Sequence, residues 1–183
     1  MKTAATQVAM RTFGEIVGTR EQGSKVRPEI LHQLREIPEG ETLILDFDGV
    51  QVFSGSFADE VVALPYQRLV NGEYGDRYIV IRSKEREVLE DLEAKLEKRE
   101  LAILVIRNGE WEVIGPLAEH LNETLRVIVS RGEISTPELA EVLDISLTNC
   151  NNRVVVLERL RLIERKRMNN PQGGIYYVNR SFI

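Results

Sequence analysis

The 183-residue sequence has little cysteine and histidine and no long hydrophobic segment. Its one cysteine, Cys150, cannot form a disulfide within the chain, which is typical of a protein from a reducing cytoplasm. Together with His32 and His120 it offers too few ligands, at unsuitable spacing, for a structural zinc site. The longest apolar run, 101–106, is far shorter than the roughly 20 residues of a membrane-spanning helix. We therefore expect a cytoplasmic protein with no membrane span, and the polar N-terminus predicts no secretory signal.

Residue patterns of the common catalytic classes are also missing. The chain has no Ser-His-Asp set, no phosphate-binding loop and no dinucleotide-binding glycine pattern. A hydrophobic content of 43% and a charged content of 29% are typical of an ordinary folded globular protein. We expect a protein that binds a partner, without catalysis, cofactor or metal.

The charges are distributed unevenly along the chain. Residues 1–120 carry 15 basic and 22 acidic side chains, whereas 121–183 carry nine basic and seven acidic ones. Within the second part, residues 146–180 hold seven basic and only two acidic groups. Because only the docking face of a protein must neutralise phosphates, this local excess predicts a nucleic-acid-binding surface despite a net charge of −5. A solvated basic face without a ligand is the alternative.

Apolar periodicity predicts an α/β domain at 12–116, preceded by a disordered or frayed tail at 1–11. Strands alternate with helices, which predicts a mostly parallel sheet, and Asn108-Gly109 favours a type I′ turn that adds a hairpin at one edge. Gly23-Ser24 should break the chain before the first helix, and Pro65 should end or kink the second. The expected strands are 12–19, 42–47, 77–81, 101–106 and 111–114, and the expected helices are 26–34, 56–64 and 84–99.

Near Gly115-Pro116 the pattern changes to helix, helix, helix and hairpin, which predicts a second domain at 117–183. Ser135 and Glu138 have the spacing of a capping box, and Ser146 can cap the next helix, at about 147–160. Two strands, at 162–168 and 175–178, flank a loop rich in turn formers. The segments PELAEVLDIS, LTNCNNRVVVLERLRLIERKR and GGIYYV carry a resemblance to the winged helix-turn-helix, with Asp144 and Arg161 at positions where glycine is common.

The resemblance implies that the helix at 147–160 contacts DNA bases and that the hairpin, the wing, contacts phosphate or the minor groove. At 100° per residue, one side of this helix lies opposite its core stripe. Asparagine there can bond adenine, and arginine can bond guanine. Winged helices also serve as protein-interaction or dimerisation modules, and the asparagines could merely solvate a helix start. The predicted DNA-binding residues are Thr148, Asn149, Asn152, Arg153, Val156, Arg159, Arg165, Lys166, Arg167 and Gln172.

The segment LILDFDGVQVFS at 43–54 allows a catalytic alternative. It is similar to the first motif of haloacid-dehalogenase-type phosphatases, which implies Asp46 as nucleophile, Asp48 as general acid and magnesium between them. That family also needs a later acidic pair at a strand end, and the run 101–106 is followed by Arg-Asn-Gly. The phosphatase is therefore the third hypothesis.

The same segment more closely resembles the STAS-like fold of anti-sigma-factor antagonists. In that fold a strand of the form L-D-x-x-G-V leads to a serine-containing loop and a helix, as at 45–57 here. The pattern Ser-Phe-Ala-Asp-Glu at 56–60, with Thr19-Arg20, Gly23 and Arg27 before it, is similar to a STAS-like branch of unassigned function. The resemblance covers about 12–115.

This resemblance implies a protein partner for the first domain. In anti-sigma antagonists a kinase-like partner phosphorylates a serine at the helix start, where Gly55 stands here between two serines. Both serines could simply cap the helix, and Asp59 could pair with Arg20 or Arg27. The predicted partner-binding residues are Arg20, Arg27, Ser54, Ser56, Asp59 and Glu60.

The sequence thus predicts an α/β STAS-like domain joined to a winged helix of three helices and a β-hairpin. We expect a DNA-binding transcriptional regulator whose first domain binds a partner or a second copy. An adaptor that binds an anti-sigma or kinase-like protein without DNA is the second hypothesis.

Overall fold

The computed structural model describes residues 5–169 and 173–183. The chain divides into two compact units, one that ends at Pro116 and one that spans Leu117–Ile183. Among the described residues, no helix is long and apolar enough to cross a membrane.

The first unit contains a five-stranded sheet in the order β1-β3-β5-β6-β7. The first four strands are parallel, and β7 runs antiparallel to β6 at one edge. Asn108 and Gly109 both have positive φ, 53° and 83°, as a type I′ turn requires. The mixed sheet with an edge hairpin is therefore confirmed. The strands are β1 (Ala5–Ala9), β3 (Thr42–Asp46), β5 (Tyr78–Arg82), β6 (Ile103–Arg107) and β7 (Glu110–Ile114).

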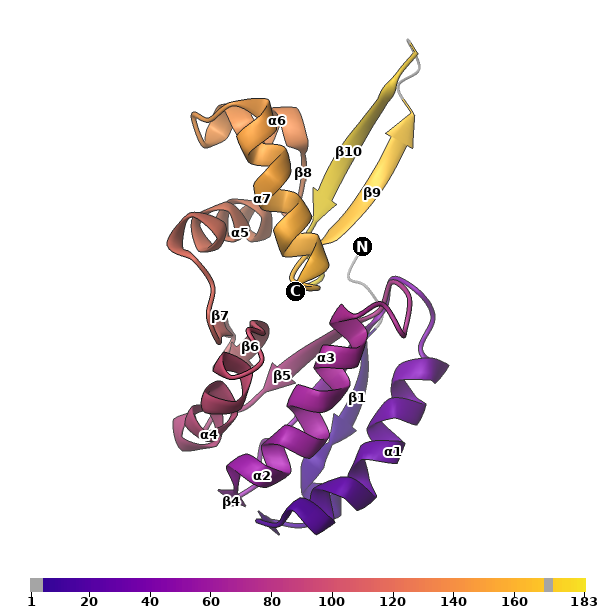
Figure 1. Cartoon of the computed structure of the whole chain (residues 1–183), viewed down its shortest axis with the longest axis vertical. Helices are drawn as coiled ribbons and strands as arrows, with labels where there is room; N and C mark the ends of the chain where they lie inside the picture. Colours follow the sequence, from indigo (N-terminus) through magenta and orange to yellow (C-terminus); the bar gives the residue numbers. More distant parts are fainter. Residues whose placement is uncertain (1–4, 170–172) are drawn as a thin grey trace. The chain divides into compact units, whose positions relative to one another are not determined.

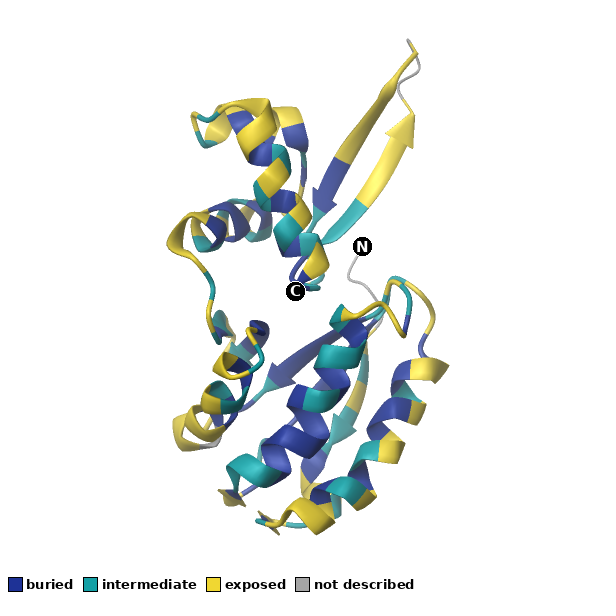
Figure 2. Cartoon of the chain, in the orientation of Figure 1, coloured by how far each residue is buried: buried dark blue, intermediate teal, exposed yellow. Residues whose placement is uncertain are grey.

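Helices connect the parallel strands of this sheet. Figure 1 shows α1 and α3 in front of β1 and β5, and Figure 2 shows buried residues on the strands and on the helices that pack against them. The core includes Leu43, Leu45, Ile79, Ile81 and Ile103 from the strands, and Ile30, Leu34, Phe57, Tyr66 and Leu92 from the helices. The helical segments are α1 (Arg20–Glu36), α2 (Gly55–Ala58), the π-helix η2 (Asp59–Ala63), α3 (Leu64–Val70) and α4 (Arg86–Glu97).

The expected frayed tail is wrong for residues 5–11. Ala5–Ala9 form β1, which pairs in parallel with β3, and Met10 is fully buried at the start of the 3-10 helix Met10–Phe13. The strand expected at 12–19 shrinks to β2 (Ile16–Val17), which pairs with β4 (Val52–Phe53). Pairing with a distant strand and burial of Met10 order this segment despite its weak local pattern.

Helix α1 begins earlier than its apolar stripe indicated. Thr19 and Gln22 form a capping box that starts the helix at Arg20, so Gly23 lies inside it and does not break the chain. Pro65 does not end the second helix either, because it lies in the first turn of α3, directly after the π-helix. The backbone stays helical through Ala63 and Leu64, and the change from π-helix to α-helix falls at Leu64, directly before Pro65.

The second unit consists of three helices and an antiparallel sheet in the order β8-β10-β9. Asp144 and Arg161 have positive φ, 51° and 59°. These are the two positions at which glycine is common in the winged helix-turn-helix that the sequence resembles. The short strand β8 (Glu133–Ser135), which pairs with β10, was not predicted. The other elements are α5 (Glu119–Arg131), α6 (Thr136–Val142), α7 (Leu147–Arg159), β9 (Glu164–Asn169) and β10 (Ile175–Arg180).

Candidate functional site

Helix α7 has one solvent-exposed side, and its opposite side is part of the core of the second unit. Ser146 caps the helix by accepting a hydrogen bond from the N–H of Asn149. Cys150, Val154 and Leu157 are buried, and the helix packs against α5 and α6. Six exposed or half-exposed residues lie within about 60° of Asn152 around the helix axis, at 100° per residue. We call them the α7 face: Thr148, Asn149, Asn152, Val155, Val156 and Arg159.

Val155 is the residue of the α7 face that the sequence prediction missed. Its side chain is 41% exposed, whereas Val154 before it is buried. The rotation of 100° per residue could have identified it, because residues 152, 155 and 159 follow the spacing of one helix face. Three consecutive valines gave no compositional sign of which one faces solvent.

Arg153 was predicted to contact DNA, and the structure places it elsewhere. Its side chain is only 13% exposed. Its Nη1 donates to the carbonyl of His120 at 3.2 Å and to Oγ1 of Thr124 at 3.3 Å, and it lies 3.4 Å from a carboxylate oxygen of Glu123. Arg153 therefore ties α7 to α5, and this part of the prediction is corrected.

Arg165 is corrected for the same reason. Its side chain is 9% exposed, and its guanidinium lies over the ring of Tyr177 at 4.0 Å from the centroid. Nη2 donates to Oδ1 of Asn151 at 2.6 Å, and Nη1 lies 3.6 Å from Glu158. The group joins α7 to the hairpin β9–β10, where it cannot reach a phosphate without leaving these partners.

The remaining predicted residues of the hairpin differ in whether they form ion pairs within the chain. Lys166 is exposed but lies 3.0 Å from Oε1 of Glu164. Arg167 is exposed and makes no ion pair within the described part of the chain. Gln172 lies outside the described residues.

Ion pairing therefore removes much of the basic surface that the composition predicted. Arg180 pairs with both Glu133 and Glu164. Within residues 5–169 and 173–183, Arg159 and Arg167 are exposed cations of this region without an ion pair. The unpaired positive charge is thus concentrated at the end of α7 and on β9.

An apolar rim borders the start of α7. Leu147 is 55% exposed, and Ile175, Tyr176 and Tyr177 on β10 are between 36% and 52% exposed. Together with Pro137 they line a hollow of about 360 Å³ between α7 and the hairpin. Exposed apolar side chains gathered in this way are typical of a surface that meets another molecule.

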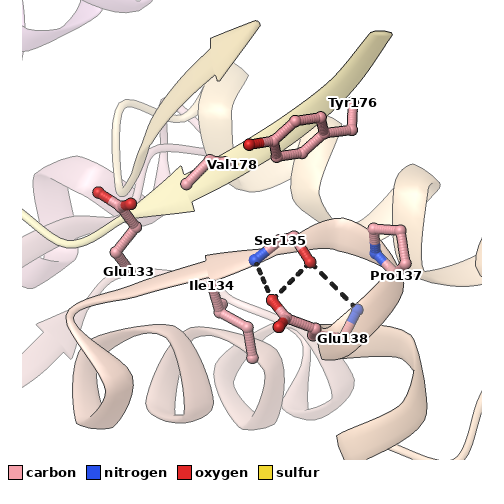
Figure 3. Close-up of a pocket in the computed structure, with 7 residues that line it drawn as sticks. All are labelled: Glu133, Ile134, Ser135, Pro137, Glu138, Tyr176 and Val178. Atoms are coloured by element: carbon pink, nitrogen blue, oxygen red, sulfur yellow. Dashed lines mark hydrogen bonds between the residues drawn. The ribbon is translucent and has the colours of Figure 1, made fainter. Parts of the chain in front are cut away.

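A second hollow, of about 560 Å³, lies between β8, the start of α6 and β10 (Figure 3). Its carboxylates already have partners in the chain. Glu138 accepts hydrogen bonds from the N–H and hydroxyl of Ser135, and these bonds lower the pKa of Glu138. Glu133 binds Arg180. The hollow therefore offers no free acid or base.

Asp46 and Asp48, the pair of the phosphatase hypothesis, are also engaged. Asp46 accepts from Gln7 Nε2 at 2.5 Å and from the N–H of Asp48 at 2.9 Å. Asp48 accepts from the N–H of Lys84 at 3.0 Å and lies 3.2 Å from its ammonium. Both carboxylates stabilise the loops that follow β3 and β5.

Asp59 and Glu60, predicted to contact a partner, lie inside the first unit at 8% and 4% exposure. Glu60 binds Arg20 at 2.6 Å and also Arg27, and Asp59 binds Arg99 at 2.9 Å. We call these five residues the arginine–carboxylate cluster. Buried charges require such pairing, so the acidic residues act within the fold. Arg20, at 59% side-chain exposure, is the most exposed member of the cluster.

Gly23 completes this arrangement by allowing close approach of α1 to η2. A Cβ at this position would lie 2.7 Å from Cβ of Glu60 and 3.3 Å from the carbonyl of Phe57. Real Cβ atoms essentially never come within 2.7 Å of another carbon, so the absence of a side chain at Gly23 lets α1 lie close enough to η2 for Arg20 and Arg27 to bind Glu60.

Three members of this cluster, Arg27, Asp59 and Glu60, and the D-x-D-G-V segment fall within a region that matches a family model. Residues 22–68 match a STAS-like domain of unknown function (DUF4325). The match covers about a quarter of the chain, from α1 into α3. Comparison with curated proteins finds no match.

The two serines of the STAS-like segment have different roles. Ser54 caps α2: its Oγ accepts from the N–H of Phe57 at 3.3 Å and donates to the carbonyl of Gly18 at 2.6 Å. Ser56 lies in the first turn, with its Oγ 3.0 Å from that of Ser54. Both are half-buried. Capping is thus confirmed for Ser54, and phosphorylation of either serine stays a prediction.

Proposed function

We propose that the chain is a DNA-binding regulator in which residues 117–183 form a winged helix-turn-helix and the STAS-like unit binds a protein partner or a second copy. The order helix, strand, helix, helix, hairpin, with a three-stranded sheet, supports this assignment. In such folds the second helix of the pair, here α7, enters the major groove.

The exposed α7 face is the observation that carries the proposal. A helix packed by one side against α5 and α6 presents Thr148, Asn149, Asn152 and Arg159 to solvent on the other. Asparagine is a weak helix former, so its repeated use on an exposed helix surface needs a reason beyond helix stability. Amide and guanidinium groups on such a surface are suited to base edges and phosphates.

The ion pairs also set the expected salt dependence. Each phosphate neutralised contributes about −0.9 to the slope of log affinity against log salt. Arg159 on the α7 face and Lys166 and Arg167 on β9 are exposed cations of this unit, and Lys166 also binds Glu164. We expect a slope of about −2 to −3 per winged helix. A slope twice as steep would mean that cations elsewhere carry the binding.

Fluorescence anisotropy of the full chain with a labelled duplex at several salt concentrations tests the proposal. Replacing Arg159 and Arg167 by alanine should weaken binding and flatten the salt slope by about two units. Arg126→Ala, which removes an exposed cation from α5, is the matched control and should leave both unchanged. Absence of duplex binding, or equal losses in both variants, would overturn the proposal.

The apolar rim favours a second candidate, a protein-binding adaptor without a DNA function. Leu147 and Ile175 are more than half exposed, which a purely phosphate-binding surface does not require. Under this candidate, Leu147→Ser should abolish capture of a protein partner, whereas Arg159→Ala should not. Under the DNA proposal, Arg159→Ala should weaken duplex binding more than Leu147→Ser does.

The proposal involves no catalysis. Asp46 and Asp48 are bonded to Gln7 and Lys84, which supports a structural role for the motif that resembled a phosphatase. Magnesium-dependent phosphatase activity that is lost in Asp46→Asn would revive the catalytic hypothesis.

A further inference from the structure

The α7 face contains a particular set of chemical groups. It presents two amides, one hydroxyl, two valine side chains and a single guanidinium. In the major groove an amide can bond N7 and N6 of adenine at once, and only thymine carries a methyl group. Bidentate recognition of guanine normally uses arginine or lysine.

The arginines that could read guanine are held away from this face. Arg153 is bonded to α5, and Arg165 is bonded to Asn151 and stacked on Tyr177. The remaining guanidinium, that of Arg159, belongs to the last residue of α7. Base contacts come mainly from the N-terminal residues of a recognition helix. Arg159 lies about two turns beyond Asn152 and is the residue of the α7 face farthest from that end, so we assign it to a phosphate.

Asn152 occupies the centre of the face and is free to bond a base. Its side chain is exposed and makes no hydrogen bond to any other described residue. Asn149, by contrast, has its Oδ1 engaged by Nε of Arg153 at 3.3 Å. Asn152 is thus the amide with both donor and acceptor available.

Two apolar side chains flank this amide. Val155 and Val156 lie about 60° and 40° to either side of Asn152 around the helix axis. Val155 is 41% exposed, although the rest of the valine run packs inward or partly inward. Their methyl groups can contact the methyl group of a thymine next to the bonded adenine.

We propose that α7 reads A·T base pairs, with Asn152 bonded to adenine N6 and N7 and Val155 and Val156 against the thymine methyl. This inference rests on the proposed DNA-binding function. It names the class of site: a duplex with an A·T core and no required guanine opposite α7.

Selection of duplexes from a random library by the full chain, followed by base analogues in the selected site, tests the inference. Replacing the core adenines by 7-deazaadenine, which lacks N7, should lower the affinity of the wild type for the duplex about tenfold. The affinity of Asn152→Ala should not fall further with the same analogue. Replacing thymine by uracil, which lacks the methyl group, should weaken binding by the wild type but not by the double variant Val155→Ala, Val156→Ala. Asn122→Ala on α5 is the matched control and should keep both sensitivities.

The outcomes distinguish failure of A·T recognition from failure of DNA binding. A selected A·T core with these analogue effects supports the inference. Duplex binding with a G·C core, with no preference, or with analogue effects that persist in Asn152→Ala overturns the inference and leaves DNA binding intact. Failure to bind any duplex overturns both. Protection of the Cys150 thiol in each variant verifies that the unit is folded.

Discussion

Gly23→Ala tests the account of the arginine–carboxylate cluster by the sign of its effect. In an exposed helix this change stabilises by about 1 kcal/mol, because alanine has the higher helix propensity. Here the added Cβ would lie 2.7 Å from Cβ of Glu60. Ordinary carbon contacts are about 3.5–4.0 Å, so α1 and η2 must separate by roughly 1 Å.

The separation has two costs. Overpacking of a close contact costs about 1–3 kcal/mol. Glu60, which is 4% exposed, would also lose optimal contact with Arg20 and Arg27. Charged hydrogen bonds contribute about 1.5–3 kcal/mol when intact, and partial loss adds to the destabilisation. After the gain in propensity, we expect a net loss of about 2 kcal/mol.

The single tryptophan makes this measurable for one unit. Trp111 lies on β7, so its fluorescence during urea unfolding reports on the first unit. Ser24→Ala changes the neighbouring position of α1, where the hydroxyl donates to the carbonyl of Glu21 in the same helix, and should remain within about 0.5 kcal/mol of wild type. An unchanged or stabilised Gly23→Ala protein would refute the close-contact argument.

Three further predictions concern the second unit, where Cys150 is the single thiol. Burial raises the pKa of this thiol, so labelling by a thiol reagent should be slow in the native protein and become fast on unfolding. Arg153→Met should lower the stability of this unit by about 1–2 kcal/mol, measured by thiol labelling in urea, while Arg159→Met should change it by less than about 0.5 kcal/mol. Ser135 lowers the pKa of Glu138 in the folded state, so the cap stabilises above the ordinary value of 4.5 and is lost as the pH falls below it; Glu138→Gln should remove this part of the pH dependence.

Local signals in the sequence were reliable where the interaction itself is local. The Asn108-Gly109 turn and the capping box of Ser135 and Glu138 involve residues within three positions of each other, and both are present. The positive φ of Asp144 and Arg161 was implied by the resemblance to the winged helix-turn-helix, in which glycine is common at both positions. These features depend on backbone conformation, which the residue types constrain directly.

Long-range pairing was the information that the sequence did not contain. Strand β1 has little apolar alternation, and it is ordered by β3, more than 30 residues away. The basic excess of the second unit looked like a phosphate-binding surface, yet Arg153 and Arg165 are bonded to groups on α5, α7 and β10. Composition counts charges and says nothing of which are already paired.

The candidate site was therefore predicted in part. Helical spacing placed Thr148, Asn149, Asn152 and Arg159 on one exposed side of α7, as the structure has them. For Asp59 the alternative of a pair with Arg20 is confirmed, because the two side chains lie 3.6 Å apart. Helical spacing could not show the pairs of Glu60 with Arg20 and of Asp59 with Arg99, because the partners lie about 40 residues away.

Backbone amide NMR of the full chain, recorded as a duplex is added, tests the central claim most directly. Binding through α7 predicts that the largest shift changes lie at 148–159 and on the exposed part of β9. Residues of the Glu133–Glu138 hollow and of the first unit should change little. No shift changes at saturating duplex, or changes centred away from α7, would contradict the account.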